Sequence, residues 1–380
     1  MIIAKPEFKV ITKPDPESEI GLYRYIEQIG RTCYKSENMI TNESATKFIT
    51  RLNSSHHWAM LEHYIFRIVL PTALVRNIMK MRSVNDPDLQ KAFDYIDVIY
   101  DIPCYDDSSL LIASPTAINT LRDAAFHAAY EYRGNSKYMD FQMGLWSASV
   151  MIKLIHGRYP LLVNDTPSLD SADEILVNNS IAITLNTNSF RVLSDHEVSS
   201  LIKYCLDAEN YDFAKTIAKL ATWFSVRFVV NRGISHELVR HRPASYAQES
   251  TRYCNYSKDK FSNQIVCICP LYYTNGQGID SNDPLFLKWK EGCEHDEKIY
   301  FELLNMGATP QQARGNLPTD LKTEIVCTTI FNEWLHIFDM RCDKRTAHPQ
   351  IVEVMQPLAD WMKQYYRNST DGCIISDLIK

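Results

Sequence analysis

The chain has 380 residues, of which 45% are hydrophobic and 23% are charged, and its net charge at pH 7 is -6. This length allows a full hydrophobic core, in one large domain or in two smaller ones. The negative charge disfavours binding to a nucleic-acid polymer, which carries charge of the same sign. No apolar run reaches the roughly 18 residues that a membrane-spanning helix needs, and the first residues lack a signal-peptide pattern. We therefore expect a cytoplasmic protein with no membrane partner and no nucleic-acid partner.

Ten cysteines are spread along the chain, and none of them forms a CxxC pair. Dispersed cysteines in a chain of this length are typical of reduced, mostly buried thiols. The spacing therefore predicts neither a disulfide framework nor a metal site.

The first half of the chain predicts helices at 18–36 and 42–52, where apolar residues recur at helical spacing, and then a strand that ends at Pro71. From 71 to 222 the pattern predicts helices at 117–132, 138–155 and 197–206. A polar loop is expected at 164–174 and a strand-like piece at 180–187. We interpret residues 71–222 as a mostly helical inserted lobe between two parts of a main domain, residues 1–70 and 223–380.

After residue 222, alternating apolar residues such as Phe224, Val226 and Phe228 predict a half-buried strand. Ser235 is expected to cap a short helix that Pro243 ends, because the residue before a proline avoids the helical region. Further helices are predicted at 296–306, 321–340 and 352–366. The fold class expected is α/β (α+β), with a mixed sheet packed by helices.

The densest chemical signal lies at 240–253, with the sequence RHRPASYAQESTRY. Guanidinium groups match the geometry of phosphate oxygens, and hydroxyl and amide groups on a loop can meet the polar edge of a flat ring. We therefore expect a nucleotide or dinucleotide site here. The alternative is a solvated basic face, which is less probable where a proline ends the helix abruptly and Ser and Tyr alternate with the charges.

This segment resembles the RHRxxSxxxxSxRY signature of flavin-dependent thymidylate synthases. Four other segments resemble motifs of the same family and occur in the family's order. They are RTCYKSE, SHHWAMLEH, GATPQQARGNLP and MRCDKRTAHPQI. The resemblance implies that residues 1–70 and 223–380 form the catalytic domain, and it leaves 71–222 as an insertion of unknown role.

The resemblance also assigns roles to individual residues. The positions that match flavin contacts are His63, Arg240, His241, Arg242 and His336. The positions that match substrate contacts are Glu237, Arg240, Gln248, Ser250, Arg252, Arg314 and Arg341. Arg341 and Ser250 are the expected catalytic residues, Arg341 by stabilising negative charge on the uracil ring and Ser250 as a binding hydroxyl rather than a covalent nucleophile.

The activity implied by the resemblance is the methylation of dUMP to dTMP. Its cofactor would be FAD, with NADPH and 5,10-methylene-tetrahydrofolate as co-substrates. The protein would then supply positioning and electrostatic stabilisation more than a nucleophile. A homotetramer with active sites at subunit interfaces is also implied.

Two positions depart from the family pattern, because Ile330 and Asn332 stand where asparagine and arginine are common. One alternative is therefore a nucleotide-binding descendant that has lost flavin, and another is an RNA-binding module. A zinc protease is excluded by geometry. His236 and His241 are five residues apart, which places them on different sides of a helix.

Overall fold

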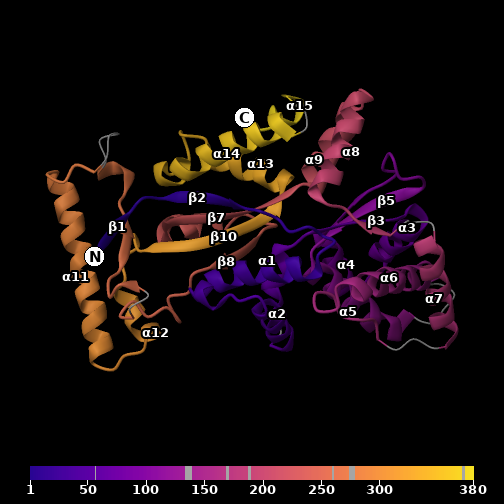
Figure 1. Cartoon of the computed structure of the whole chain (residues 1–380), viewed down its shortest axis with the longest axis horizontal. Helices are drawn as coiled ribbons and strands as arrows, with labels where there is room; N and C mark the ends of the chain where they lie inside the picture. The colour runs from indigo at the N-terminus through magenta and orange to yellow at the C-terminus, as the bar shows by residue number, and fades with distance from the viewer. Residues whose placement is uncertain are drawn as a thin grey trace.

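The structure of the chain is a computed structural model. It describes residues 1–55, 57–132, 139–167, 171–186, 190–258, 261–273, 279–369 and 373–380. The molecule is elongated and has three parts along its longest axis, as Figure 1 shows. A four-stranded sheet lies in the middle, a second sheet with its helices lies at one end, and a smaller part that contains the N-terminus lies at the other.

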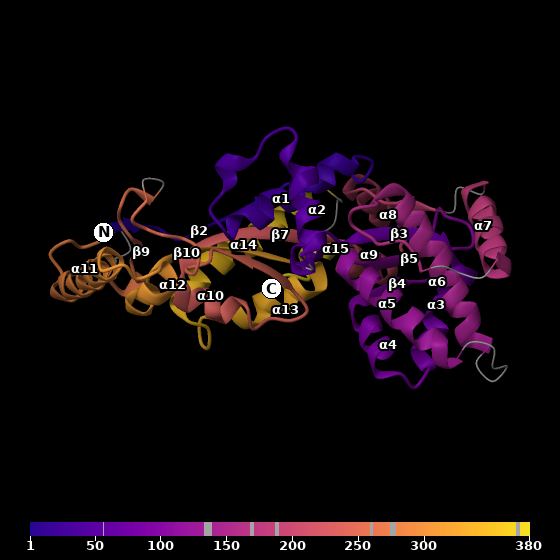
Figure 2. The same ribbon diagram turned by 90° about the horizontal axis from the view of Figure 1, so that it is seen from below.

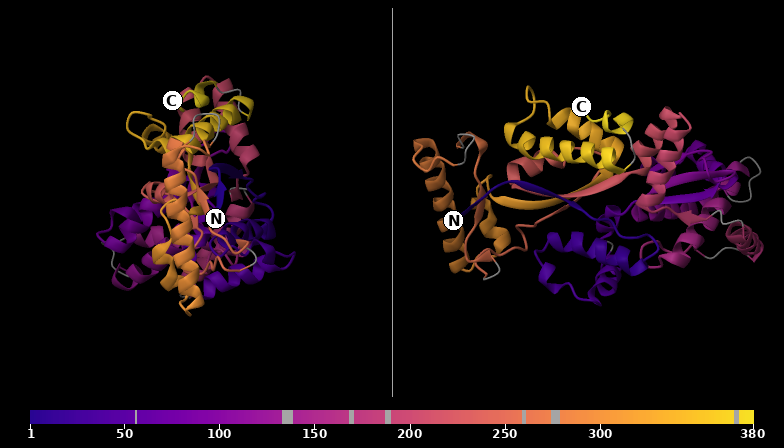
Figure 3. Two further views of the ribbon diagram at one scale, coloured as in Figure 1. Left: turned by 90° about the vertical axis from the view of Figure 1, so that its left-hand side faces the viewer. Right: turned by 45° about the horizontal axis from the view of Figure 1, so that its top comes forward.

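The central sheet is antiparallel throughout. Its strands, in spatial order, are β2 (Glu7–Ile11), β7 (Trp223–Asn231), β10 (Lys322–Ile330) and β8 (Ser245–Gln248). Helices cover both of its faces (Figure 3). One face carries α13 (Phe331–Arg341) and α14 (Pro349–Ser369), and the other carries α1 (Glu19–Thr32) with α2 (Ser44–Ser54) beside it.

The second sheet is also antiparallel. Its strands, in spatial order, are β4 (Ile96–Ile99), β5 (Ser108–Ala113), β3 (Phe66–Pro71) and β6 (Arg191–Val192). The helices around it are α3 (Thr72–Lys80), α4 (Pro87–Ala92), α5 (Pro115–Tyr132), α6 (Met139–Arg158), α7 (Ser171–Asn186), α8 (Asp195–Asp207) and α9 (Tyr211–Ala221). Figure 2 shows this group at one end of the molecule, with α7 at its outer edge.

The smaller part pairs β1 (Ile2–Ala4) with β9 (Val266–Ile268) in parallel, beside the long helix α11 (Pro284–Asn305). The remaining α-helices are α10 (Arg232–Leu238), α12 (Pro310–Ala313) and α15 (Cys373–Ser376). The short 3-10 helices are η1 (Glu37–Met39), η2 (Trp58–His63), η3 (Met81–Ser83), η4 (Phe93–Tyr95), η7 (Leu271–Tyr273) and η8 (Arg314–Asn316).

The expected α/β fold with helices packed on sheets is confirmed, and so are most of the predicted helices. Parallel and antiparallel pairings both occur, but in separate sheets. Residues 71–222 are not only helical, since β4, β5 and β6 lie among their helices. Among the described residues, no helix is both long and apolar enough to cross a bilayer.

The helix predicted at 321–340 is wrong in its first half. Residues Lys322–Ile330 form β10, which lies between two other strands and is buried along most of its length. A strand buried on both faces has a nearly continuous apolar run, which periodicity alone cannot distinguish from a buried helix. The helix begins only at Phe331.

Two smaller predictions are also wrong. The strand-like piece at 180–187 lies in α7 as far as Asn186, and its last residue is outside the described residues. The short helix before Pro243 begins at Arg232, and its cap is Asn231, whose side chain accepts a hydrogen bond from the Ile234 backbone at 2.8 Å. Ser235 lies inside the helix and donates to the Arg232 carbonyl at 2.9 Å. Asparagine caps as well as serine does, so residue type could not decide between them.

Candidate active site

The corner between α10 and β8 carries the first half of the arginine-rich motif. After α10 ends at Leu238, the chain turns through residues 239–244, with a cis peptide bond before Pro243, and enters β8 at Ser245. Arg240 and Arg242 are exposed here, whereas His241 is buried. The Arg240 side chain makes no hydrogen bond or ion pair with the part of the chain that the structure describes. This corner thus offers free guanidinium charge to a ligand.

Arg341 at the end of α13 ties this corner to the helix layer. Its Nε donates to Nε2 of His241 at 2.9 Å, and its guanidinium forms an ion pair with Glu237 at 2.6 Å. The ring of His336 lies 5.9 Å from that of His241. Burial, then the charges of Arg341 and His336, lower the pKa of His241 to about 4. His241 is therefore neutral at pH 7 and can accept the hydrogen bond from Arg341.

His63 lies on the opposite side of β8, at the end of η2. Its ring is fully buried, and Nδ1 is 2.7 Å from the Thr328 hydroxyl on β10. Burial lowers the pKa of His63 to about 3, so the ring is neutral. Its Nε2 is buried and has no hydrogen-bond partner among the described residues. An imidazole nitrogen left without a partner costs about 1–3 kcal/mol, which a ligand group could recover.

Glu62 connects η2 to the motif. The Ser245 hydroxyl donates to its carboxylate at 3.0 Å, and the charge of Arg242 also acts on it. Burial nevertheless raises the pKa of Glu62, because the loss of hydration outweighs both favourable contacts. Sequence reasoning missed Glu62, although it directly precedes His63 in the histidine-bearing segment.

Gln248 ends β8 and is anchored from two sides. Its Nε2 donates to the Ser235 hydroxyl of α10 at 2.8 Å and to the Thr323 hydroxyl of β10 at 3.2 Å. Two donated bonds fix the amide and leave its carbonyl oxygen available to accept from a ligand.

The second half of the motif runs toward the smaller part of the molecule. Ser250 is held through its backbone, which donates to the Cys33 carbonyl at 2.9 Å, and its hydroxyl accepts from the Arg252 backbone at 3.3 Å. The Arg252 guanidinium donates to Gln311 of α12 at 3.1 Å. Arg314 follows α12 in η8 and is exposed. Arg252 and Arg314 therefore come from adjoining elements.

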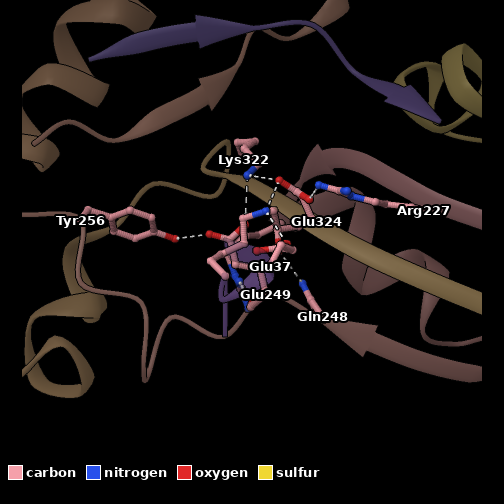
Figure 4. Close-up of polar contacts among 10 residues, drawn as sticks. Glu37, Arg227, Gln248, Glu249, Tyr256, Lys322 and Glu324 are labelled. Carbon is pink, nitrogen blue, oxygen red and sulfur yellow. Dashed lines mark hydrogen bonds and ion pairs between the residues drawn. The ribbon is translucent and has the colours of Figure 1, made fainter. Parts of the chain in front are cut away.

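An ion-pair network lies next to this segment, as Figure 4 shows. Lys322 contacts Glu249 at 3.1 Å and Glu324 at 2.8 Å. Glu324 also pairs with Arg227, and Tyr256 donates to Glu249 at 3.2 Å. Burial lowers the pKa of Lys322, and its carboxylate partners oppose this shift. A cavity of about 400 Å³ adjoins the network. The charges in the network are mutually satisfied, so we assign them a structural role.

The structure thus groups the predicted residues in three places. Glu237, His241, His336 and Arg341 form one cluster, and Arg242 comes near the η2 segment that ends at His63. Gln248, Ser250, Arg252 and Arg314 follow along β8 and its continuation. Arg240 directly precedes His241 in the sequence, and its side chain is exposed to solvent.

Comparison with known proteins identifies the family. Residues 169–366, just over half of the chain, match the family model described as thymidylate synthase complementing protein. The chain belongs to this family. The matched part contains the arginine-rich motif and every predicted site residue except His63, which lies before it.

Several relatives of the chain are named flavin-dependent thymidylate synthase. The protein from Pyrococcus furiosus is 29% identical over 177 residues, which cover 47% of this chain and 67% of that protein. The protein from Pyrococcus abyssi is 27% identical, over 47% of this chain and 73% of its own length. The protein from Geobacter sulfurreducens is 27% identical, over 38% of this chain and 60% of its own.

Proposed function

We propose that this protein is a flavin-dependent thymidylate synthase that methylates dUMP to dTMP with reduced FAD and 5,10-methylene-tetrahydrofolate. The observation that carries the proposal is the corner after α10, where Arg240 and Arg242 are exposed beside the cluster held by Arg341. Family members named for this activity support the same assignment.

The residues of the corner, together with His63 on the other side of the edge strand β8, fit a flavin nucleotide. FAD would bring phosphate oxygens that pair with guanidinium groups, and a ring whose polar edge can satisfy Nε2 of His63. The residues that would hold it are His63, Arg240, His241, Arg242 and His336. When bound, reduced FAD supplies the two electrons of the methylation, and NADPH would restore them.

The nucleotide would be held by the residues along β8 and its continuation. Ser250, Arg252 and Arg314 offer a hydroxyl and two cations for the phosphate and sugar, and Gln248 offers a fixed amide oxygen. Glu237 and Arg341 would face the uracil ring. Arg341 is preorganised by its pairing with Glu237, so it can stabilise negative charge on the ring without reorganising.

In the proposed reaction, the methylene carbon of the folate gives up both of its bonds to nitrogen, forms a bond to the uracil ring and becomes a methyl group by gaining a hydride. The two folate nitrogens take up two protons, one that replaces the hydrogen lost from the uracil ring and one from the reduced cofactor. The products are dTMP, tetrahydrofolate and oxidised FAD. Because neither transfer needs a protein nucleophile, the residues of the chain serve to orient the reactants and to exclude water.

We also propose that the protein acts in the cytoplasm and forms a homotetramer, as the family resemblance implies.

A second candidate function is nucleotide binding without flavin chemistry. It is favoured by Ile330, an aliphatic residue where the family has a polar one, and by Asn332, whose amide donates to Glu333 at 3.3 Å and carries no charge. Such a protein would bind dUMP and remain colourless when FAD is added.

The test is dTMP formation from dUMP, methylene-tetrahydrofolate, FAD and NADPH by the purified protein. We expect turnover by the wild type and a loss of at least about tenfold for Arg240→Ala, because one lost charge-assisted contact is worth about 1.5–3 kcal/mol. Arg345→Ala is the matched control, since Arg345 is an exposed arginine that pairs with Asp343 outside the cluster. Wild-type protein that binds dUMP but makes no dTMP would favour the second candidate.

A further inference from the structure

The two four-stranded sheets have the same connectivity. In the second sheet, β3 runs directly into α3 and pairs with β5, which is followed by α5. In the central sheet, β7 runs directly into α10 and pairs with β10, which is followed by α13. The third strand, β4 or β8, precedes β5 or β10 in the chain and pairs with its outer edge. The spatial orders β6-β3-β5-β4 and β2-β7-β10-β8 therefore correspond strand by strand.

The correspondence extends to single residues. The strand-to-helix junctions Pro71–Thr72 and Asn231–Arg232 align Ile68 with Phe228, each three residues before its junction. The row across the second sheet through Ile68 reads Val192, Ile68, Leu111, Val98. The row across the central sheet through Phe228 reads Phe8, Phe228, Ile325, Gln248. Four strands with matching order and direction indicate two copies of one fold.

The first strand of each copy lies in the sheet of the other. β2 precedes β3 in the chain but pairs with β7, and β6 precedes β7 but pairs with β3. The helix that follows β2 is exchanged in the same way, because Tyr25 of α1 donates to Ser225 of β7 at 2.5 Å. Val198 and Ile202 of α8 lie in a buried cluster that joins Leu110 of β5 to Val226 of β7.

We propose that residues 7–158 and 191–369 are two structural repeats, which pack together within one chain as the two subunits of a strand-swapped dimer would. Such a dimer has two equivalent positions for a ligand site, and we propose that this chain has a functional site at one of them. On this proposal, residues 71–222 hold most of the first repeat and the start of the second, in place of an independent inserted lobe. The nature of the ligands rests on the function proposed above.

The first repeat has surface ion pairs and a buried methionine at the corner that corresponds to the arginine-rich motif. The junction alignment places Lys80, Met81 and Arg82 at the positions of Arg240, His241 and Arg242. Lys80 forms an ion pair with Asp140 of α6 at 3.0 Å, and Arg82 lies 3.9 Å from Asp94. Met81 is fully buried, so it offers no group to a ligand.

Helix α6 packs on this corner at Met81. A Cβ atom added to Gly144 of α6 would lie 2.3 Å from the Met81 side chain and 2.7 Å from the Asn77 carbonyl oxygen. The glycine thus allows α6 to pack closely on α3, and α6 occupies the surface next to Met81.

The first repeat instead contributes to the site of the second. Helix η2 of the first repeat brings Glu62 to Ser245 and His63 to Thr328, both of the second repeat. The site therefore lies where the two repeats meet, and a single chain supplies both of its sides. At the reciprocal position the same alignment places Trp223, a fully buried indole, where His63 stands. The Lys13 ammonium lies 4.6 Å from the centre of the indole ring and pairs with Asp195 at 2.7 Å. Side chains of the protein therefore occupy the reciprocal position, and it has no imidazole to offer a ligand.

The stoichiometry and origin of the site can be tested with the full-length protein. We expect one FAD per chain by absorbance after desalting and one dUMP per chain by calorimetric titration, unchanged in a Lys80→Ala, Arg82→Ala variant. His63→Ala and Arg240→Ala should each lose FAD. The His63→Ala chain and the Arg240→Ala chain are then co-expressed, each with its own affinity tag, and assemblies that carry both tags are purified. These mixed assemblies should still retain no FAD, and if no mixed assembly forms, the two variant chains purified separately should retain none.

Each result decides one point. Two FAD or two dUMP per chain would overturn the single site, and recovery of FAD in the mixed assembly would overturn the intrachain origin of the site. A wild-type protein that binds neither ligand would instead refute the proposed function, and the ligand site inferred here with it.

Discussion

Replacing His63 by asparagine should make the protein less sensitive to acid. Asparagine can still hydrogen-bond to Thr328 but does not titrate. The buried His63 has a pKa of about 3, whereas in the unfolded chain it should titrate near its ordinary value of 6.5. As pH falls below 6.5 the unfolded chain takes up a proton that the native state does not. The stabilisation is therefore complete above pH 6.5 and is lost as pH falls toward 3.

The magnitude follows from the linkage relation. Each pH unit between these two values changes the free energy of unfolding by about 1.4 kcal/mol, so acidification from pH 7 to pH 5 costs the wild type about 2 kcal/mol through His63 alone. His241 contributes in the same direction, but it is present in both proteins and cancels in the comparison. The His63→Asn variant should therefore lose about 2 kcal/mol less than the wild type over this range.

The assay is urea unfolding followed by tryptophan fluorescence at pH 7 and pH 5. His57→Asn serves as the control, because His57 is exposed at the other end of η2 and should leave the pH dependence unchanged. If His63→Asn and the wild type lose the same free energy between the two pH values, His63 is not buried in its neutral form and the reasoning fails.

Three other predictions concern single side chains. Arg341→Met should raise the pKa of His241 above about 4, since the guanidinium helps to lower it, and an unchanged value in an NMR titration would count against the cluster. Trp334→Ala should destabilise the protein by about 3–5 kcal/mol and the half-exposed Trp361→Ala by less, and equal denaturation midpoints would contradict this. Cys104 is the exposed cysteine among those that the structure describes, so Cys104→Ser should remove the fastest phase of thiol modification; if that phase persists, Cys104 is not the reactive thiol.

Local patterns in the sequence identified most helices, because amphipathic spacing in segments such as α1 and α2 reflects a single buried face. Local patterns did not identify β10 as a strand, because β10 is buried on both faces. Its neighbours in the sheet, β7 and β8, lie far from it in the sequence. The exchange of β2 and β6 between sheets was likewise beyond a local pattern, since strand pairing depends on tertiary contacts.

The site followed the same division. The motif at 240–253 was visible because its residues are contiguous, and its exposed arginines agree with a ligand-binding surface. The partners of these residues come from elsewhere. Thr328 lies on a strand that was predicted as a helix, and its contact with His63 joins residues 265 positions apart. Spacing along the chain holds no record of such contacts.

The absorption spectrum of the purified protein, recorded after incubation with FAD and removal of the free cofactor, shows whether FAD binds at this corner. We expect an oxidised-flavin band that stays with the protein, bleaches with NADPH, and is absent from the Arg240→Ala variant. A colourless wild-type protein, or a band equally strong in wild type and variant, would contradict the placement of FAD at this corner.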